Sequence, residues 1–427
     1  MTEPMSQSEI HVASDEPVGT GRFPAFESPF LHAPEGARTI FLVTLAAACG
    51  PLLGGIVLFG WRAALVAAIS IVSCAAIERA YFFVSRTPAL LGRSHAYLTG
   101  MLLALTLPAY VPWYVPVVAS AFAIIVGKGI FGGVGHFIWQ PALVGRLAAA
   151  VLFSTTLISP LPDRPTVGPI LAPSKMLVGN IRSAGTKFGA RRWRGESSPI
   201  GQDALLVERP EVTLKSLTSS RQPGFSGLAS RHEASAANRP LAIMSLPPID
   251  EMIIGARPGG IGETCVVVIL VAGLYLVYRN YVRLHLPLAF IVSAGCVAAV
   301  SPVYFAGIGN TVIKAWPLAS AEHLGTRLDA GLIYVAYQLL SGEFFLAAFF
   351  LATETTSRPV TGGGQVIYAV TGGALAMLLK LHVDMPIPAY MAVLAANTMT
   401  IMIDSFWRPR VFGQKRFAFL RRNKQSI

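Results

Sequence analysis

The sequence carries little charge. Only 13% of its 427 residues are Asp, Glu, Lys or Arg, whereas 53% are hydrophobic, and the mean hydropathy is +0.57. About a quarter of the residues in soluble chains are charged, so this composition excludes a soluble globular protein and indicates an integral membrane protein. The net charge of +12 comes from basic residues at the ends of apolar runs, which argues against a nucleic-acid-binding surface.

Paired cysteines and a signal peptide are missing too. The four cysteines lie scattered through apolar runs without any Cys-x-x-Cys pair, which favours apolar packing over iron–sulfur ligation: Cys49, Cys74, Cys265 and Cys296. The N-terminal residues are polar and slightly acidic, instead of basic and then apolar. We therefore expect the first apolar run to be an uncleaved span.

Ten apolar runs predict an all-α, multi-pass membrane protein. They cover residues 40–60, 63–83, 97–107, 113–131, 141–159, 264–278, 286–305, 332–352, 366–381 and 387–403. The run at 97–107 is too short to cross a bilayer alone, so we predict a half-helix or a broken span there. Five runs on either side of a polar insertion suggest two related halves.

The runs divide the chain into five parts. These are a polar N-terminal segment (1–38), a first membrane half (39–159), an extramembrane insertion (160–258), a second membrane half (259–405) and a basic tail (406–427). Lys and Arg gather at the run ends that share a side with both termini. The positive-inside rule then predicts cytoplasmic termini and an insertion on the outer side.

A glycine-rich loop follows the fourth run. It contains Gly129, Gly132, Gly133 and Gly135, and glycine lets a backbone approach a ligand or another helix closely. Pro141 suits the first turn of the next helix. That helix carries Arg146 inside the apolar zone, so we interpret the loop as a cavity-lining break. A tight inter-helix turn fits the composition equally well.

A second polar break follows the run at 332–352. Its Thr353-Glu354-Thr355-Thr356 sequence offers hydroxyls and a carboxylate as a rim for a cofactor or a cation, although an ordinary capped turn explains the same residues. Glu343 lies within the apolar run itself. An ionisable group there is a functional candidate, unless it merely bonds a neighbouring helix.

A third glycine-rich stretch opens the sixth run. Gly259, Gly260 and Gly262 precede Glu263 and Thr264 at the expected start of a helix. The free amides of a helix N-terminus suit an anionic group such as phosphate. The carboxylate of Glu263 would oppose such an anion unless it faces elsewhere.

Four motifs together resemble one family in order and spacing. They are GMLLALTLP at 100–108, FGGVG at 131–135 followed by QPALVG at 140–145, PGGIGET at 258–264 and AFFLATE at 348–354. The resemblance is to the D subunit of Rnf-type electron-transport complexes, a relative of the B subunit of the sodium-translocating NADH:quinone reductase. It covers residues 28–405 and is weakest across the insertion.

The resemblance implies ten helices in two inverted five-helix repeats. It also implies a subunit of a bacterial inner-membrane complex that couples electron transfer to ion movement, with other membrane subunits as partners. In that family a flavin mononucleotide (FMN) is linked through its phosphate to a threonine in a Ser-Gly-Ala-Thr motif. The expected cofactor-binding residues are those of the three breaks, with no metal site: Gly132, Gly133, Gly135, Gly262, Glu263, Thr264, Thr353 and Glu354.

The sequence departs from the family at the flavin acceptor. No Ser-Gly-Ala-Thr occurs between residues 160 and 258, and Asn238 and Arg239 stand where the acceptor is expected. The Thr-Asp-Pro motif of the family is Thr353-Glu354-Thr355 here, and its Asn-Pro-Ala motif is Gln140-Pro141-Ala142. We therefore expect a flavin that is held without a covalent bond or has been lost.

Three functional interpretations stay open at this point. The first is a divergent membrane subunit of an Rnf-like ion-translocating complex. The second is a channel or transporter that uses the same bundle for a small solute. The third is a structural or accessory membrane protein. The missing acceptor motif favours the last two, whereas the glycine loops and the Thr-Glu pair favour the first.

Overall fold

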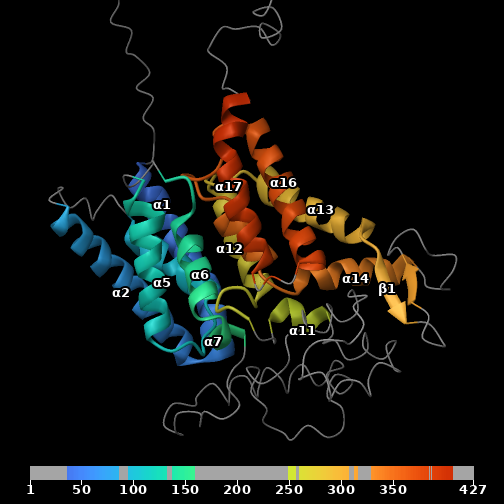
Figure 1. Ribbon diagram of the computed structural model, residues 1–427, viewed down its shortest axis with the longest axis horizontal. Helices are drawn as coiled ribbons and strands as arrows, with labels where there is room; N and C mark the ends of the chain where they lie inside the picture. Colours follow the sequence, from blue (N-terminus) through green and yellow to red (C-terminus); the bar gives the residue numbers. More distant parts are fainter. Residues whose placement is uncertain are drawn as a thin grey trace, which may run out of the picture.

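In the computed structural model, the helices form two neighbouring groups that follow the order of the chain. The structure describes residues 36–85, 95–131, 137–158, 249–255, 259–306, 312–315, 328–383, 385 and 387–406. Helices from the first half of the chain lie on the left in Figure 1, and those from the second half lie on the right. The groups meet where α1 packs against α12 and α6 packs against α17.

The first group consists of α1 (Ala37–Phe59), α2 (Trp61–Val84), α4 (Ala96–Thr106), α5 (Tyr114–Ile124) continuing into the π-helix η1 (Ile125–Gly129), α6 (Pro141–Leu152) and α7 (Ser154–Ile158). The predicted short helix at 97–107 is confirmed as α4. Nearly all of its residues are buried, and α1, α2 and α6 pack around it. Pro108 lies just beyond its end, where a helix is difficult to continue.

The second group consists of α11 (Ile249–Ile254), α12 (Val266–Tyr278), α13 (His285–Val300), α14 (Leu328–Leu340), α15 (Phe344–Leu346) continuing into the π-helix η6 (Ala347–Leu351), α16 (Gly362–His382) and α17 (Pro388–Phe406). Pro388 begins α17 as Pro141 begins α6, because a first-turn proline has no amide to leave unpaired.

Each of the ten predicted runs contains a helix, but the helices differ in length. Four are long and apolar enough to cross a membrane: α1, α2, α16 and α17. A fifth span results if α14 and α15–η6 count as one bent pair. In the described part of the chain, five shorter apolar helices have 10–17 residues: α4, α5 with η1, α6, α12 and α13. The chain is thus a multi-pass helical membrane protein with four or five candidate spans.

Two predicted runs were wrong in detail. The run at 332–352 is not one helix, because it bends by 71° between α14 and α15, where Gly342 has a φ of 120°. The run at 286–305 ends as a helix at Val300 and continues as a strand, β1 (Val303–Ala306), paired antiparallel with β2 (Val312–Ala315). Pro302 interrupts the helix, and the valine, tyrosine and phenylalanine that follow favour a strand.

Glycines at two positions allow packed segments to approach each other closely. A Cβ at Gly373 of α16 would lie 2.1 Å from the carbonyl oxygen of Phe290 in α13. A Cβ at Gly55 of α1 would lie 2.3 Å from the carbonyl oxygen of Ile261, which precedes α12. Small residues let membrane helices pack backbone to backbone, where apolar lipid gives little drive for association. These contacts fix the frame around the polar site.

Candidate functional site: a polar pocket between two helix breaks

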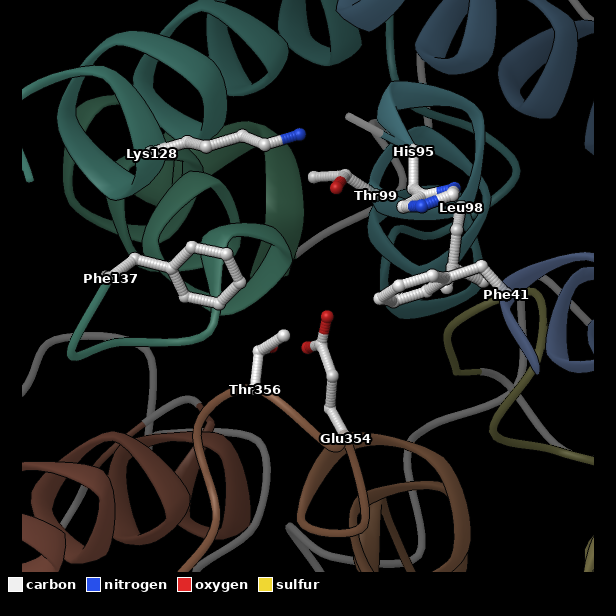
Figure 2. A pocket seen from close by; sticks show the side chains of 8 residues that line it. All are labelled: Phe41, His95, Leu98, Thr99, Lys128, Phe137, Glu354 and Thr356. Carbon is white, nitrogen blue, oxygen red and sulfur yellow. The ribbon is translucent and has the colours of Figure 1, made fainter. Parts of the chain in front are cut away.

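The first two predicted breaks come together around one small pocket. It is lined by Phe41, His95, Leu98, Thr99, Lys128, Phe137, Glu354 and Thr356. These residues come from α1, the start of α4, η1, the segment before α6 and the second break. Figure 2 shows the carboxylate of Glu354 and the ammonium of Lys128 extending into this space from opposite sides. The sites of Gly132, Gly133 and Gly135 lie outside the described residues, between Lys128 and Phe137.

Lys128 forms a buried ion pair. Its Nζ lies 2.7 Å from Oε1 of Glu78 in α2, and the two side chains are only 5% and 2% exposed. The π-turn of η1 carries this lysine inward, and π-turns in helices are often found at functional sites. A buried charge is tolerated when it is paired, so Glu78 keeps a cation beside the pocket.

Glu354 offers an acceptor without a partner. Its Oε2 is shielded from solvent and accepts no hydrogen bond, although the residue as a whole is partly exposed. Glu354 follows η6 and lies outside the spanning helices. Burial raises the pKa of this carboxyl from 4.5 to about 7, while the nearby Gln140, Lys128 and Thr356 act in the opposite direction. The group can therefore gain or lose a proton near neutral pH.

His95 forms another wall of the pocket. It precedes α4 with a φ of 56°, and its ring stacks on Phe41 with centroids 3.8 Å apart. Burial lowers the pKa of His95, and the positive charge of Lys128 lowers it further. The imidazole is therefore neutral at pH 7, and Lys128 supplies the positive charge at this wall.

Several buried polar atoms around the second break have no hydrogen-bond partner. They are Oγ of Ser357, Oε1 of Gln365 and Nδ2 of Asn397, whereas the Gln140 amide and the Thr356 hydroxyl lie close enough to the Glu354 carboxyl to lower its pKa. Buried polar groups in native proteins nearly always have partners, including water and ions. This combination of donors and acceptors suits water or a small ion better than an apolar molecule.

Unlike Glu354, Thr353 uses its side chain to bond its own segment. Its Oγ1 donates to the carbonyl oxygen of Phe349 at 2.6 Å, one turn back in its own segment. This is the capped-turn alternative for that residue. Cofactor binding by Thr353 stays a prediction.

The amides of the third glycine-rich stretch are already used. Gly260 N donates to Oε2 of Glu263 at 2.8 Å, Ile261 N to Leu107 O at 2.9 Å, and Gly262 N to Leu105 O at 2.8 Å. This stretch thus pairs with the end of α4, and these hydrogen bonds link the two groups of helices. Thr264 is fully buried and its Oγ1 has no partner. Cofactor binding by Gly262, Glu263 and Thr264 stays a prediction.

The remaining predicted candidates surround Tyr390 in α17. Its hydroxyl donates to Oε1 of Glu263, and both Glu343 and Arg146 lie within electrostatic range of it. Arg146 also donates from Nε to Thr106 O at 2.9 Å. Glu343 accepts from the backbone N of Ala389 at 2.7 Å and so caps the N-terminus of α17. The structure thus places Glu354 at the pocket and Glu263, Glu343 and Arg146 around Tyr390.

Sequence reasoning missed three buried ionisable residues. Glu78, Lys128 and Lys380 lie near the ends of the runs at 63–83, 113–131 and 366–381. All three are at most 4% exposed. The available signal was their position within or beside apolar runs, where an ionisable group is costly and needs a partner.

The helices and the buried charges define a multi-pass membrane protein with an internal polar site. The sequence matches the NQR2, RnfD, RnfE family over residues 25–413, and the chain belongs to this family. Its relatives include the D subunits of ion-translocating oxidoreductase complexes from three bacteria. The protein of Halorhodospira halophila is 26% identical, over 91% of this chain and 95% of the relative.

The other two relatives are similarly distant and also match over most of their length. The Yersinia pseudotuberculosis protein is 28% identical, over 91% of this chain and 97% of its own length. The Stutzerimonas stutzeri protein is 29% identical, over 84% and 87%. The predicted resemblance to the Rnf D subunit is therefore confirmed along most of the chain.

Proposed function

We propose that this chain is a membrane subunit of an Rnf-like ion-translocating electron-transport complex, and that the pocket between the two breaks is its proton- or cation-binding site. The shielded Oε2 of Glu354 carries this proposal, because it is an anionic acceptor without a partner that faces a buried lysine. The names of the relatives support a place in a multi-subunit oxidoreductase complex. The bacterial inner membrane as its location and other membrane subunits as its partners are part of the proposal.

Charge compensation is the chemistry that the pocket offers. A proton or a monovalent cation on Glu354 would neutralise the carboxylate, and its release would leave a negative charge facing Lys128. Because Lys128 is already paired with Glu78, the vacated pocket would hold two carboxylates and one ammonium. Burial makes that state costly, so it favours rebinding of a cation. A site with this property can couple its occupancy to charge changes in partner subunits.

We also propose that the two helix groups are inverted repeats. Several local features support this. Each short buried helix follows a residue with positive φ, His95 before α4 and Gly342 before α15. Each is followed by a break in the helix and then by a helical segment that ends near a buried lysine, Lys128 or Lys380. In each half the next helix begins with a proline.

A phosphoester-linked FMN does not fit the residues present. The stretch before α12 offers no phosphate cradle, since its amides at 260–262 are bonded and Glu263 adds negative charge there. Asn238 and Arg239, at the expected acceptor position, lie outside the described residues. We expect no flavin fluorescence from the protein in a denaturing gel. A fluorescent band that persists after denaturation would contradict this proposal.

The ion-binding proposal is tested with Glu354→Gln in the assembled complex. In inverted membrane vesicles we expect electron transfer and ion uptake to fall together, by about tenfold or more, which corresponds to about 1.4 kcal/mol. Asp404→Asn is the matched control, because this carboxylate accepts a weak bond from Val360 N outside the pocket. Normal ion uptake by a well-expressed Glu354→Gln complex would remove Glu354 from the site.

Two further measurements separate the remaining alternatives. Solute flux through the purified chain in liposomes, without any redox partner, would favour a transporter. Assembly of a fully active complex around a chain whose pocket has been disrupted would favour an accessory role.

Orientation is a further part of the proposal. We propose cytoplasmic termini, with residues 160–258 on the outer side, from the distribution of Lys and Arg. Reporter fusions after Arg283 and Arg422 should indicate the cytoplasm, and fusions within 180–230 the outside. A cytoplasmic signal from the latter would overturn this topology.

A further inference from the structure

The break between α14 and α15 exposes carbonyl oxygens inside the protein. α14 ends at Leu340, Gly342 has a φ of 120°, and the chain leaves the break at an angle of 71°. The last carbonyls of a helix have no partner within it. In Figure 1, α14 lies across the lower end of α16, the helix that carries Lys380 near its C-terminus.

Lys380 places its ammonium on these oxygens. Nζ donates to Gln338 O at 2.7 Å, to Oγ of Ser341 at 2.8 Å and also to Ser341 O. The ring of Phe344, with its centroid 5.0 Å from Nζ, adds a cation–π contact. The lysine is 3% exposed. A broken helix thus surrounds a single positive charge with carbonyls, a hydroxyl and an aromatic face.

Such a set of oxygens is also what a monovalent cation requires. Unwound carbonyls at half-helix ends coordinate Na⁺ in membrane transporters, and carbonyl oxygens replace the hydration shell of K⁺ in channels. An ammonium group is similar in size to K⁺. The three oxygens of Gln338 and Ser341 are neutral, so they suit a charge of +1 better than a divalent ion.

We propose that the α14–α15 break is a monovalent-cation site filled by the protein's own ammonium group, and that it binds K⁺ or NH₄⁺ when the side chain of Lys380 is removed. In the natural protein the tethered ammonium closes this break to mobile ions. The proposal does not depend on the role of the pocket at Glu354, because it rests on other residues and its test needs no electron transfer.

The test uses the full-length chain with Lys380→Ala, purified in detergent with either choline or K⁺ as the cation at equal ionic strength. In choline we expect a melting temperature lower than that of the natural protein by about 5 °C or more, since several charge-assisted hydrogen bonds are lost. K⁺ and NH₄⁺ should restore at least half of this loss. Neither ion should shift the natural protein comparably.

Two matched variants isolate the site. Leu378→Ala truncates an exposed neighbour on α16, 43% exposed, and should show no difference between K⁺ and choline. Lys380→Ala combined with Ser341→Ala lacks one oxygen of the site and should need several-fold more K⁺ for the same shift. Binding of Tl⁺, a K⁺ analogue, should give one more saturable site in Lys380→Ala than in the natural protein, and the double variant should weaken that site.

Every outcome decides the proposal. Restoration by K⁺ or NH₄⁺ but not by choline supports it, together with the additional Tl⁺ site. A destabilised variant that no monovalent cation restores would overturn it and leave Lys380 as a fixed hydrogen-bond donor. A variant that fails to fold in cells grown with ample K⁺ outside would also overturn it, because the proposed topology places this break toward the outer side, where K⁺ should fill it.

Discussion

Two buried lysines, Lys128 at the end of α5–η1 and Lys380 at the end of α16, differ in the kind of partner that they bind. Lys128 pairs with the carboxylate of Glu78, and the carboxylate of Glu354, whose Oε2 has no hydrogen-bond partner, faces the same pocket. Lys380 binds two backbone carbonyls and a hydroxyl at a broken helix. Both side chains are almost fully buried, so burial alone does not distinguish them.

The difference lies in whether the partners can change charge. A carboxylate can take up a proton or a cation, so the surroundings of Lys128 can exist in more than one charge state. Carbonyl and hydroxyl oxygens do not titrate in the physiological pH range, so the three oxygens that Lys380 bonds keep the same charge across it. Lys128 belongs to a site whose charge can change, whereas Lys380 binds neutral oxygens at the α14–α15 break.

The largest expected effect comes from breaking the ion pair at Lys128. Lys128→Met leaves the carboxylate of Glu78 buried without its cation, which costs about 3–5 kcal/mol of stability. Thermal unfolding of the detergent-solubilised chain measures this loss. Glu78→Gln combined with Lys128→Met should recover most of it, since the stranded charge is removed. A double variant no more stable than Lys128→Met alone would show that the pairing is not the source of the effect.

The second effect is a pH dependence caused by Glu354. Its pKa is raised on folding, from 4.5 to about 7, so its contribution to stability is full below pH 4.5 and is lost as the pH rises through 7. The loss is at most about 3 kcal/mol. Melting temperatures between pH 5 and 8 measure it. Glu354→Gln should flatten this part of the profile, and an unchanged profile would assign the pH dependence to another group.

A smaller effect is expected at Glu343, which lies in the break between α14 and α15. Glu343→Ala removes the acceptor for the backbone N of Ala389 and should cost about 2 kcal/mol. Glu343→Gln keeps an acceptor oxygen there and should cost less than half of that. Equal losses in the two variants would mean that the charge of Glu343, and not its hydrogen bond to α17, stabilises the fold.

The smallest effect is expected at Thr353, one residue before Glu354. Thr353→Val removes the hydrogen bond to Phe349 O but keeps the shape of the side chain, so the loss should stay below about 1 kcal/mol. Unfolding measurements at one pH suffice. A loss comparable to that of Lys128→Met would show that Thr353 bears on the pocket and not only on its own helical turn.

The parts of the fold that depend on local sequence were predictable. Pro108 and the length of the run at 97–107 identified a short helix, and α4 is that helix. Pro141 indicated the start of α6. By contrast, the apolar composition of 332–352 concealed the bend at Gly342, because a hydropathy pattern carries no information on φ.

The site was predictable only in its separate pieces. Glu354 was identified from its motif, but its position opposite Lys128 depends on contacts between segments more than 200 residues apart, and no local pattern encodes those. The partner of Glu343 was equally out of reach, since Ala389 contributes a backbone amide, which any residue type but proline could supply.

The π-turns of η1 and η6 have a consequence for how the protein tolerates changes in length. In each turn a backbone amide bonds a carbonyl five residues back, Ile130 N to Ile125 O at 3.0 Å and Ala352 N to Ala347 O at 2.7 Å. Each turn therefore holds one residue more than a regular α-helix needs. Deleting one residue within 347–351 would let the helix close with ordinary α-helical bonds and leave the flanking turns in register. The same deletion inside α16 would rotate all following side chains by about 100°.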